Sequence, residues 1–381
     1  MDSNIIRLSK SVLDTEEAQA VSDVILKSGY LGMGKDVQSF EKEIQAFLQT
    51  KSEVICVNTG TSAIHLAIQA CGIGSGDEVL VPSLTYIASY QAISATGAKA
   101  ISCDIDISTG LLSLEDAKQR ITKNTKAILY VHYASNTGDL NNLYSFAKSN
   151  GLRVIEDSAH SFGCEYKGKK IGSFGDITCF SFDGIKNITS GEGGAIVTAD
   201  QNIANHCKDA RLLGVEKDTE MRFSGERSWV FDVKNQGWRY HMSNIMAAIG
   251  RVQLKKFSES FCKRRIEIKN LYQSLLANNK SIKFLAYCTD TKVVPHIIPI
   301  IVPENLRDIL VDSLRKNGIQ AGVHYYPNHF LTKYKTDYSL PNTESLYKKI
   351  LTLPIHPDLK DDDVKYIVGT LIETIKRAGI E

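Results

Sequence analysis

The feature that most constrains the fold is an alternation of short apolar runs with segments of helical spacing. Strands are predicted at EVICVNTG, DEVLVPSL, KAISCDID, KAILYVHYA and LRVIEDSA, and helical patterns between them include TSAIHLAIQACGIG, SLEDAKQRI and NLYSFAKSNG. Strands that alternate with helices form a parallel sheet covered by helices. The sequence therefore predicts an α/β fold with a mostly parallel central sheet flanked by helices.

The pattern changes from Ser243 onward. A long helical run, SNIMAAIGRVQLKKFSESFCKRRIEIKNLYQSLLANN, is followed by a predicted strand, VVPHIIPIIV, and by a helix, NLRDILVDSLRKNG. We therefore divide the chain into a large α/β domain of residues 1–245 and a smaller C-terminal α+β domain of residues 246–381.

Composition and charge argue against several classes of protein. The 381 residues are 43% apolar and 23% charged, and 45 basic against 43 acidic residues give a net charge of +2, so a general nucleic-acid binder is not expected. No apolar run is long enough to span a bilayer, and the first residues lack the pattern of a signal peptide. The eight cysteines are scattered, without the close pairs of a zinc site. We expect a cytoplasmic protein that binds no metal, nucleic acid or membrane.

Polar residues follow the predicted strands, and ligands of open parallel sheets bind at these carboxyl ends. Gly60, Thr61 and Ser62 come where a strand gives way to a helix, and their N–H groups and hydroxyls suit a phosphate. Taken alone, such a pattern is more often only a helix cap. Ser181 ends the run CFSF, so its hydroxyl is expected at the same edge of the sheet.

Three further side chains add what pyridoxal phosphate requires. Asp157 follows strand residues, where a carboxylate is costly to bury without a partner. Tyr86 offers a ring for stacking, and Lys186 stands before the glycine cluster in SFDGIKNITSGEGG. Their ordinary alternatives are a helix cap, core packing and a solvated surface charge. Together, a phosphate cradle, a carboxylate, an aromatic face and an amine match this cofactor.

The chain also resembles the sugar aminotransferases of the DegT/DnrJ/EryC1/StrS family over nearly its whole length. The matching segments include SGYLGMGKDVQSFEKEIQAFL, NTGTSAIHLAIQACGIGSGDEVLVPSLTYIAS, KAILYVHYASNTGDL, VIEDSAHSFGCEYKGKKIGSFGDITCFSFDGIKNITSGEGGAIVT, GVHYYPNH and LTLPIHP. The resemblance implies a fold-type-I pyridoxal-phosphate enzyme that works as a homodimer with active sites at the subunit interface. It also implies amination of a nucleotide-linked keto-sugar, with glutamate or glutamine as donor.

The resemblance implies roles for individual residues. Lys186 is expected to form the Schiff base with the cofactor and then move a proton, while Asp157 pairs with the pyridinium and Tyr86 stacks on the ring. His160 is expected beside the ring or its hydroxyl, the alternative being a hydrogen-bonded core histidine. The phosphate ligands implied by the resemblance are Gly60, Thr61 and Ser181.

The substrate side is defined less sharply. His324 and His329 in GVHYYPNH are expected to line the sugar pocket, although without the resemblance they read as surface or core histidines. A stretch between Val215 and Tyr240 mixes basic and aromatic residues, which suits either a loop for a diphosphate and a base or a solvated loop over the dimer seam. These residues are Lys217, Arg222, Phe223, Arg227, Trp229, Phe231, Lys234, Trp238 and Arg239.

Two positions depart from the family pattern. Asp183 stands where the family often has histidine, and we assign it no catalytic role. In GWRYHM the family usually has an asparagine and an arginine at the positions of Arg239 and His241, and the asparagine reaches the phosphate of the neighbouring subunit. A guanidinium binds phosphate strongly, so Arg239 is expected at the cofactor phosphate or at the substrate diphosphate.

The combination of SGYLGMG, VHYAS and EDSAH resembles members that act at C4 of a 4-keto-6-deoxyhexose, such as dTDP-4-keto-6-deoxyglucose. The product would be an amino-deoxy sugar for polysaccharide, O-antigen or glycoconjugate synthesis. Amination of a 3-keto-sugar stays open as an alternative. A related dehydratase has histidine at the position of Lys186, so the lysine in this chain argues against dehydration. An alternative from another class is a non-catalytic regulator that binds pyridoxal phosphate.

Overall fold

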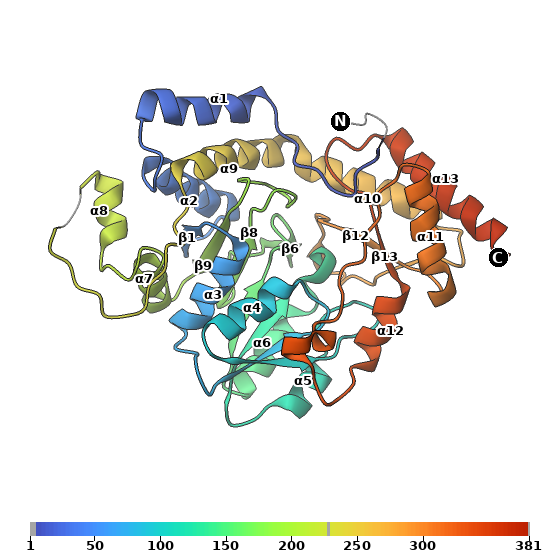
Figure 1. Ribbon diagram of the computed structural model, residues 1–381, viewed down its shortest axis with the longest axis horizontal. Coiled ribbons are helices and arrows are strands. Elements are labelled where there is room, and N and C mark those ends of the chain that lie inside the picture. Colours follow the sequence, from blue (N-terminus) through green and yellow to red (C-terminus); the bar gives the residue numbers. More distant parts are fainter. Residues whose placement is uncertain (1–4, 227–228, 380–381) are drawn as a thin grey trace.

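The centre of the molecule is a seven-stranded sheet with the order β1-β9-β8-β5-β4-β2-β3 (Figure 1). A computed structural model describes residues 5–226 and 229–379. In the sheet, β9 is antiparallel to both neighbours, and every pair from β8 to β3 is parallel. The strands are β1 (Glu53–Val57), β2 (Glu78–Pro82), β3 (Lys99–Cys103), β4 (Thr125–Val131), β5 (Arg153–Asp157), β8 (Ile177–Ser181) and β9 (Gly194–Thr198). The predicted α/β fold with a mostly parallel sheet is confirmed.

Both faces of this sheet are buried. In β4, Ile128 and Tyr130 belong to one apolar cluster, whereas Ala127 and Leu129 belong to another. Successive side chains of a strand point to opposite faces, so the two clusters are two layers separated by the sheet. The helices that contribute to the first layer are α2 (Lys35–Leu48), α5 (Leu114–Arg120), α6 (Leu140–Ser149) and α9 (Asn244–Lys256), and those of the second are α3 (Gly60–Ala70), α4 (Ile87–Ala95) and α7 (Gln201–Ala210).

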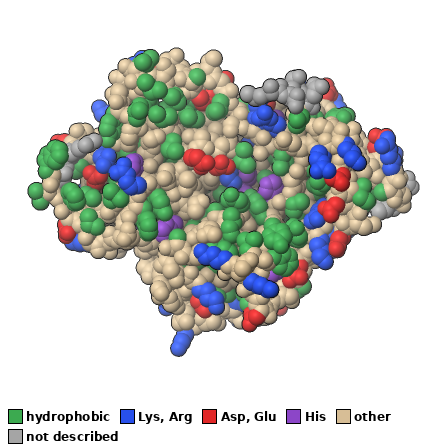
Figure 2. All heavy atoms as spheres, viewed as in Figure 1, with side chains coloured by type: hydrophobic (Ala, Val, Ile, Leu, Met, Phe, Trp, Pro, Cys, Tyr) green, Lys and Arg blue, Asp and Glu red, His purple; other side chains and the backbone are tan. Residues whose placement is uncertain are grey.

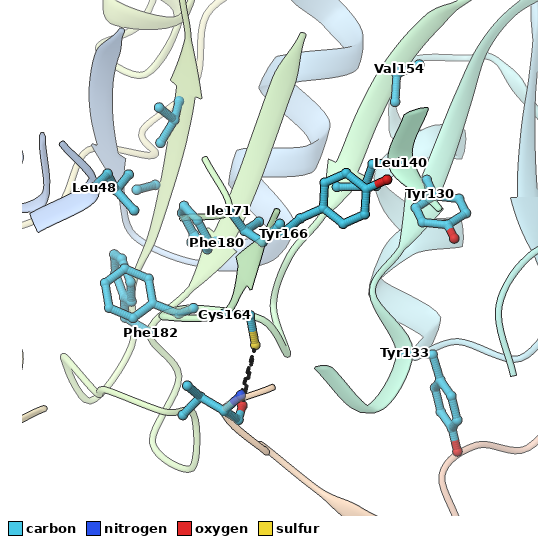
Figure 3. Close-up of a cluster of buried hydrophobic side chains, with 14 of the residues drawn as sticks. Leu48, Tyr130, Tyr133, Leu140, Val154, Cys164, Tyr166, Ile171, Phe180 and Phe182 are labelled. Atoms are coloured by element: carbon cyan, nitrogen blue, oxygen red, sulfur yellow. Dashed lines mark hydrogen bonds between the residues drawn. The ribbon is translucent and has the colours of Figure 1, made fainter. Parts of the chain in front are cut away.

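The first layer also joins the sheet to the C-terminal part of the chain. Figure 3 shows aromatic side chains of this layer, including Phe180 of β8 and Tyr130 of β4, together with Cys164. The sulfur of Cys164 accepts a hydrogen bond of 3.3 Å from the N–H of Val294. The segment that follows Val294 is thereby held against the edge of the large sheet's core.

The C-terminal part has its own sheet and core. Its antiparallel sheet has the order β10-β12-β13, and a third apolar cluster runs from Ile268 to Ile375. The elements are α10 (Cys262–Leu276), β10 (Lys283–Phe284), β12 (Ile298–Ile301), α11 (Glu304–Lys316), α12 (Pro341–Lys349), β13 (Ile350–Leu353) and α13 (Asp361–Arg377). The division at residue 245 stays a prediction; it falls at the start of α9, which packs on α2 and α1 (Thr15–Asp23).

The remaining elements are short. A small sheet of order β11-β6-β7 connects residues far apart in sequence, and a helix projects at one side of the molecule (Figure 1). These elements are β6 (Glu165–Tyr166), β7 (Lys169–Lys170), β11 (Thr291–Lys292), α8 (Asp218–Ser224), the π-helical turns Val24–Ser28 and Phe257–Phe261, and the 3₁₀ turns Tyr133–Ser135, Asn328–Phe330 and Thr332–Tyr334.

The predicted strand VVPHIIPIIV is shorter than expected. Only Ile298–Ile301 pair in a sheet, as β12. The N–H groups of Val294 and His296 are bonded instead to Cys164 Sγ and Ser135 Oγ. Residues before β12 therefore follow the surface of the large sheet's core rather than extending the small sheet.

Among the residues that the structure describes, no helix is both long enough and apolar enough to cross a bilayer. Within the same ranges, no group of three or more His, Cys, Asp and Glu side chains is arranged to hold a metal ion.

A buried ion pair fixes β1 to its flanking helices. Arg211, which ends α7, has a fully buried side chain and donates from Nη1 to Glu41 Oε1 of α2 at 2.5 Å and to the carbonyl of Cys56 at 2.7 Å. The same carboxylate oxygen accepts the N–H of Cys56 at 2.9 Å. Removing one member of such a pair leaves an uncompensated charge in the core.

We predict that Arg211→Met lowers the free energy of unfolding by about 3 to 5 kcal/mol, the usual cost of breaking a buried pair. Urea unfolding followed by circular dichroism measures this loss. Lys365→Met, which removes the exposed pair with Asp362, is the control and should cost less than about 1 kcal/mol. Equal losses for the two variants would show that the buried pair is not a special constraint.

Candidate active site

A cavity of about 430 Å³ lies where the parallel strands end. Near the centre of the face seen in Figure 2, histidine and acidic side chains lie close together. Most of the predicted site residues line this cavity: Gly60, Thr61, Tyr86, Asp157, His160, Ser181, Lys186 and His324. Residues from several separate strand ends therefore share one site, as expected for an open parallel sheet.

One wall of the cavity is built for close approach of a ligand to the backbone. A Cβ at Gly60 would lie 2.7 Å from Ser181 Cβ, so only glycine fits beside that serine. The hydroxyl of Thr59 caps α3 by accepting the N–H of Ser62 at 3.0 Å. The N–H groups of Gly60 and Thr61, in the first turn, have no partner within the helix and suit an anion.

Asp157 ends β5 and is buried in the cavity. Its carboxylate accepts hydrogen bonds from Ser89 Oγ at 2.9 Å and from the N–H of Ala159 at 3.2 Å. Burial raises the pKa of Asp157, while these two hydrogen bonds and the charge of Lys186 oppose the rise. A positively charged ring nitrogen beside this carboxylate would supply the partner that burial demands.

Lys186 lies on the loop after β8 and is partly buried. Its Nζ is 3.4 Å from Nε2 of His296. Burial lowers the pKa of Lys186, and the carboxylates of Asp157 and Asp183 oppose this effect. A lysine with a lowered pKa holds more of the neutral amine, which is the nucleophilic form.

His160 is buried and connects the cavity wall to Tyr325. Its Nδ1 accepts the N–H of Ala134 at 3.3 Å, and its Nε2 lies 2.9 Å from the hydroxyl of Tyr325. Burial lowers the pKa of His160 well below its usual value, so the ring is neutral. Because Nδ1 accepts, Nε2 carries the proton and donates to Tyr325, which leaves the phenolic hydrogen for another acceptor.

Tyr86 and His324 line the outer part of the cavity. Tyr86 precedes α4, is 59% exposed, and its ring centroid lies 5.8 Å from that of Tyr325. This exposure leaves its ring accessible to a flat ligand. His324 Nδ1 is 2.9 Å from Thr352 Oγ1, and burial, followed by the charge of Lys186, lowers the pKa of His324 to about 4.

Three predicted residues are not brought to the cavity. Ser62 is buried, and its hydroxyl donates to Asn58 Oδ1 at 2.6 Å. The Nδ1 of His329 is hydrogen-bonded to Ser83 Oγ at 2.7 Å, so this histidine holds the loop after β2 in place. The side chain of Arg239 is exposed, although its backbone lies beside the end of β1, where its carbonyl accepts from Asn58 at 3.4 Å. Arg227 lies outside the described residues.

The sequence reasoning missed residues that the structure places around the site. Tyr325 lies next to the predicted His324, but the resemblance implies a role only for the histidines of GVHYYPNH. Ser89 lies one helical turn after Tyr86, a spacing that puts both at the start of α4. His296 sits in an apolar run and had no local signal apart from being a polar residue between Pro295 and Ile297.

Comparison with known proteins defines the family. The sequence pattern of the DegT/DnrJ/EryC1/StrS aminotransferase family matches residues 12–372. The chain belongs to this family. Its members are pyridoxal-phosphate-dependent sugar aminotransferases, so this chain is a transaminase whose cofactor is pyridoxal phosphate. The predicted family and cofactor are confirmed.

Individual relatives cover nearly the whole chain. A Bacillus subtilis protein named Spore coat polysaccharide biosynthesis protein SpsC is 33% identical over 97% of each chain. The dTDP-4-dehydro-2,3,6-trideoxy-D-glucose 4-aminotransferase of Saccharopolyspora spinosa is 33% identical over 98% of this chain and 97% of its own. Among solved structures, the PLP form of Spr1654 from Streptococcus pneumoniae is similar with a TM-score of 0.89, at 29% identity over 98% of this chain and 99% of its own.

The residues of the cavity fit this cofactor. A glycine cradle beside Ser181 suits its phosphate, the buried carboxylate of Asp157 suits a protonated ring nitrogen, and the amine of Lys186 suits its aldehyde.

We predict that Gly60→Ala weakens cofactor binding about tenfold, because the added Cβ displaces Ser181 and overpacking costs about 1 to 3 kcal/mol. Titration of the apoenzyme with pyridoxal phosphate, read by absorbance, measures the change. Gly369→Ala, where the added Cβ meets nothing within 4 Å, is the matched control. Unchanged affinity for Gly60→Ala would place the phosphate elsewhere.

Proposed function

We propose that this enzyme transfers an amino group from glutamate to C4 of a nucleoside-diphosphate-linked 4-keto-6-deoxyhexose. The observation that carries this proposal is the cavity in which Lys186, Asp157 and Ser181 meet. The named activity of the Saccharopolyspora spinosa relative, a 4-aminotransferase on a dTDP-linked keto-sugar, supports the position of amination. The name of SpsC supports a product used in polysaccharide synthesis.

Each residue of the cavity has its own proposed role in the reaction. The cofactor, when bound, withdraws electrons from the carbon that carries the transferred amino group. Lys186 would hold the cofactor through its amine, and the free amine would move the proton at the donor's α-carbon. Asp157 would keep the ring nitrogen protonated, and the exposed ring of Tyr86 would cover one face of the cofactor. His160, through its Nε2–H, donates toward the ring hydroxyl or to Tyr325.

We propose further that the working form is a homodimer with each site completed by the second subunit. The loop after α8 presents apolar side chains to solvent, with Trp229 88% and Phe231 61% exposed. Exposed apolar residues of this size mark contact surfaces. Arg239 follows on the same stretch and is itself exposed, which suits a residue that acts at a neighbouring subunit's phosphate.

The substrate is tested by a panel of dTDP-, UDP- and GDP-linked 4-keto and 3-keto sugars with glutamate or glutamine, read by product mass. We expect amination of a 4-keto sugar with glutamate and loss of at least about 10³-fold in rate for Lys186→Ala. Exposed Lys169→Ala is the control, with an unchanged rate. A 3-keto product would move the reaction to C3, and no turnover with any sugar would favour a cofactor-binding regulator.

A mixing experiment tests the shared site. Lys186→Ala should be inactive alone and Arg239→Ala strongly impaired, but mixed dimers should regain activity because one of their two sites carries both residues intact. Arg239→Ala should release the cofactor more readily if its partner is the cofactor phosphate, and raise the KM for the nucleotide sugar if its partner is the diphosphate. Exposed Lys169→Ala is again the control. No recovery despite subunit exchange rules out action across the interface.

A further inference from the structure

His296 is a buried histidine that faces the amine of Lys186. Its Nε2 lies 3.4 Å from Lys186 Nζ, and its backbone N–H is bonded to Ser135 Oγ at 2.9 Å. It stands on the segment before β12, far from Lys186 in sequence. A residue from the C-terminal part of the chain therefore reaches the proposed catalytic amine.

Arg265 of α10 links the backbone of Lys186 to that of Pro295, the residue before His296. Its Nη1 donates to the carbonyl of Pro295 at 3.2 Å, and its Nη2 donates to the carbonyl of Lys186 at 3.4 Å. The side chain is fully buried, and burial lowers its pKa to about 10, so it is charged at neutral pH. One guanidinium thus sets the separation of the loop that carries Lys186 from the segment that carries His296.

The surroundings of His296 decide its protonation. Burial, followed by the charge of Lys186 and contributions from His160 and Arg265, lowers the pKa of His296 well below its usual value, so the ring is neutral. Its Nδ1 is buried and has no hydrogen-bond partner among the described residues. A buried N–H without an acceptor is costlier than an unfilled lone pair, so the single proton is better placed on Nε2.

We propose that His296 donates its Nε2–H to the lone pair of the Lys186 amine, and that Arg265 is the positioning residue that holds the two in register. This rests on the proposed role of Lys186. Only the neutral amine has a lone pair to accept this bond, so the contact stabilises the form that attacks the cofactor and takes up a proton. No proton is transferred between the two groups.

Other charged and titratable groups also act on the Lys186 amine. The carboxylates of Asp157 and Asp183 favour its ammonium form, while burial disfavours it. The histidines around it are neutral at pH 7, because burial holds their pKa values low. The groups that face Lys186 from the elements packed against it are Asp157, Asp183, His160, His296, His324 and Arg265.

The test measures the pKa of Lys186 in the full-length enzyme loaded with pyridoxamine phosphate, which has no aldehyde and leaves the lysine free. Trace acetic anhydride labels the neutral amine, and peptide mass spectrometry across pH 6 to 11 gives the titration curve. We expect His296→Phe to raise this pKa by about one unit, because the neutral form loses its donor. His296→Gln, whose amide donates, should restore most of the shift.

His356→Phe is the matched control. His356 is also buried, also has an unpartnered Nδ1, and also feels the charge of Arg265, but the structure records no contact between it and Lys186. Its substitution should leave the titration of Lys186 unchanged. An unchanged pKa in His296→Phe would overturn the proposal, and so would a fall, which would mean that His296 accepts from the ammonium form.

The role of Arg265 is tested by Arg265→Lys, which keeps the charge but replaces the planar guanidinium fork with a single ammonium group. The variant should raise the pKa of Lys186 in the same direction as His296→Phe, and the double variant should shift it no further than His296→Phe alone. Additive shifts would show that Arg265 acts independently of His296. Borohydride reduction of the pyridoxal-phosphate form separately tests whether Lys186 binds the cofactor, so failure of the proposed function is distinguishable from failure of this inference.

Discussion

The site depends on burying a carboxylate and an amine of opposite charge in one cavity. Burial raises the pKa of Asp157 and lowers that of Lys186, so each is pushed toward its neutral form. Their charges oppose that effect, and the bonds from Ser89 and Ala159 hold the carboxylate in place. A protonated ring nitrogen would pair with this carboxylate and an aldehyde would react with this amine, so the two side chains fit pyridoxal phosphate.

The parallel sheet brings the residues of the cavity together. Parallel strands buried on both faces bring their carboxyl ends to one edge, where loops are free to carry polar residues. β9 is the exception: it runs antiparallel between β1 and β8. Its first residue, Gly194, passes so close to the backbone that a Cβ there would lie 2.5 Å from the carbonyl of Thr59. The cavity wall at Gly60 is therefore held in place by β9 as well as by α3.

Much of this was readable from the sequence because the signals are local. Strand runs, helix starts and polar residues at strand ends predicted the sheet and the placing of Asp157, Ser181 and Lys186. The antiparallel direction of β9 was not predicted, since GAIVT follows a glycine turn that permits either direction. His329 is close to His324 in sequence, but a 3₁₀ turn at Asn328–Phe330 directs it to Ser83 instead of the cavity.

Contacts between distant segments could not be read in this way. His296 lies on the segment before β12, and Arg265 lies on α10. The sequence patterns of both segments predict only that they are buried. Nothing in their local sequence indicates that they meet Lys186. The structure shows the connection through Arg265 of α10, whose Nη1 and Nη2 donate to the carbonyls of Pro295 and Lys186. Since no carboxylate among the described residues pairs with that guanidinium, its burial is costly and is best explained by what it holds in place. Arg265 therefore makes the C-terminal part of the chain a structural component of the active site, and not only a cover for the sheet.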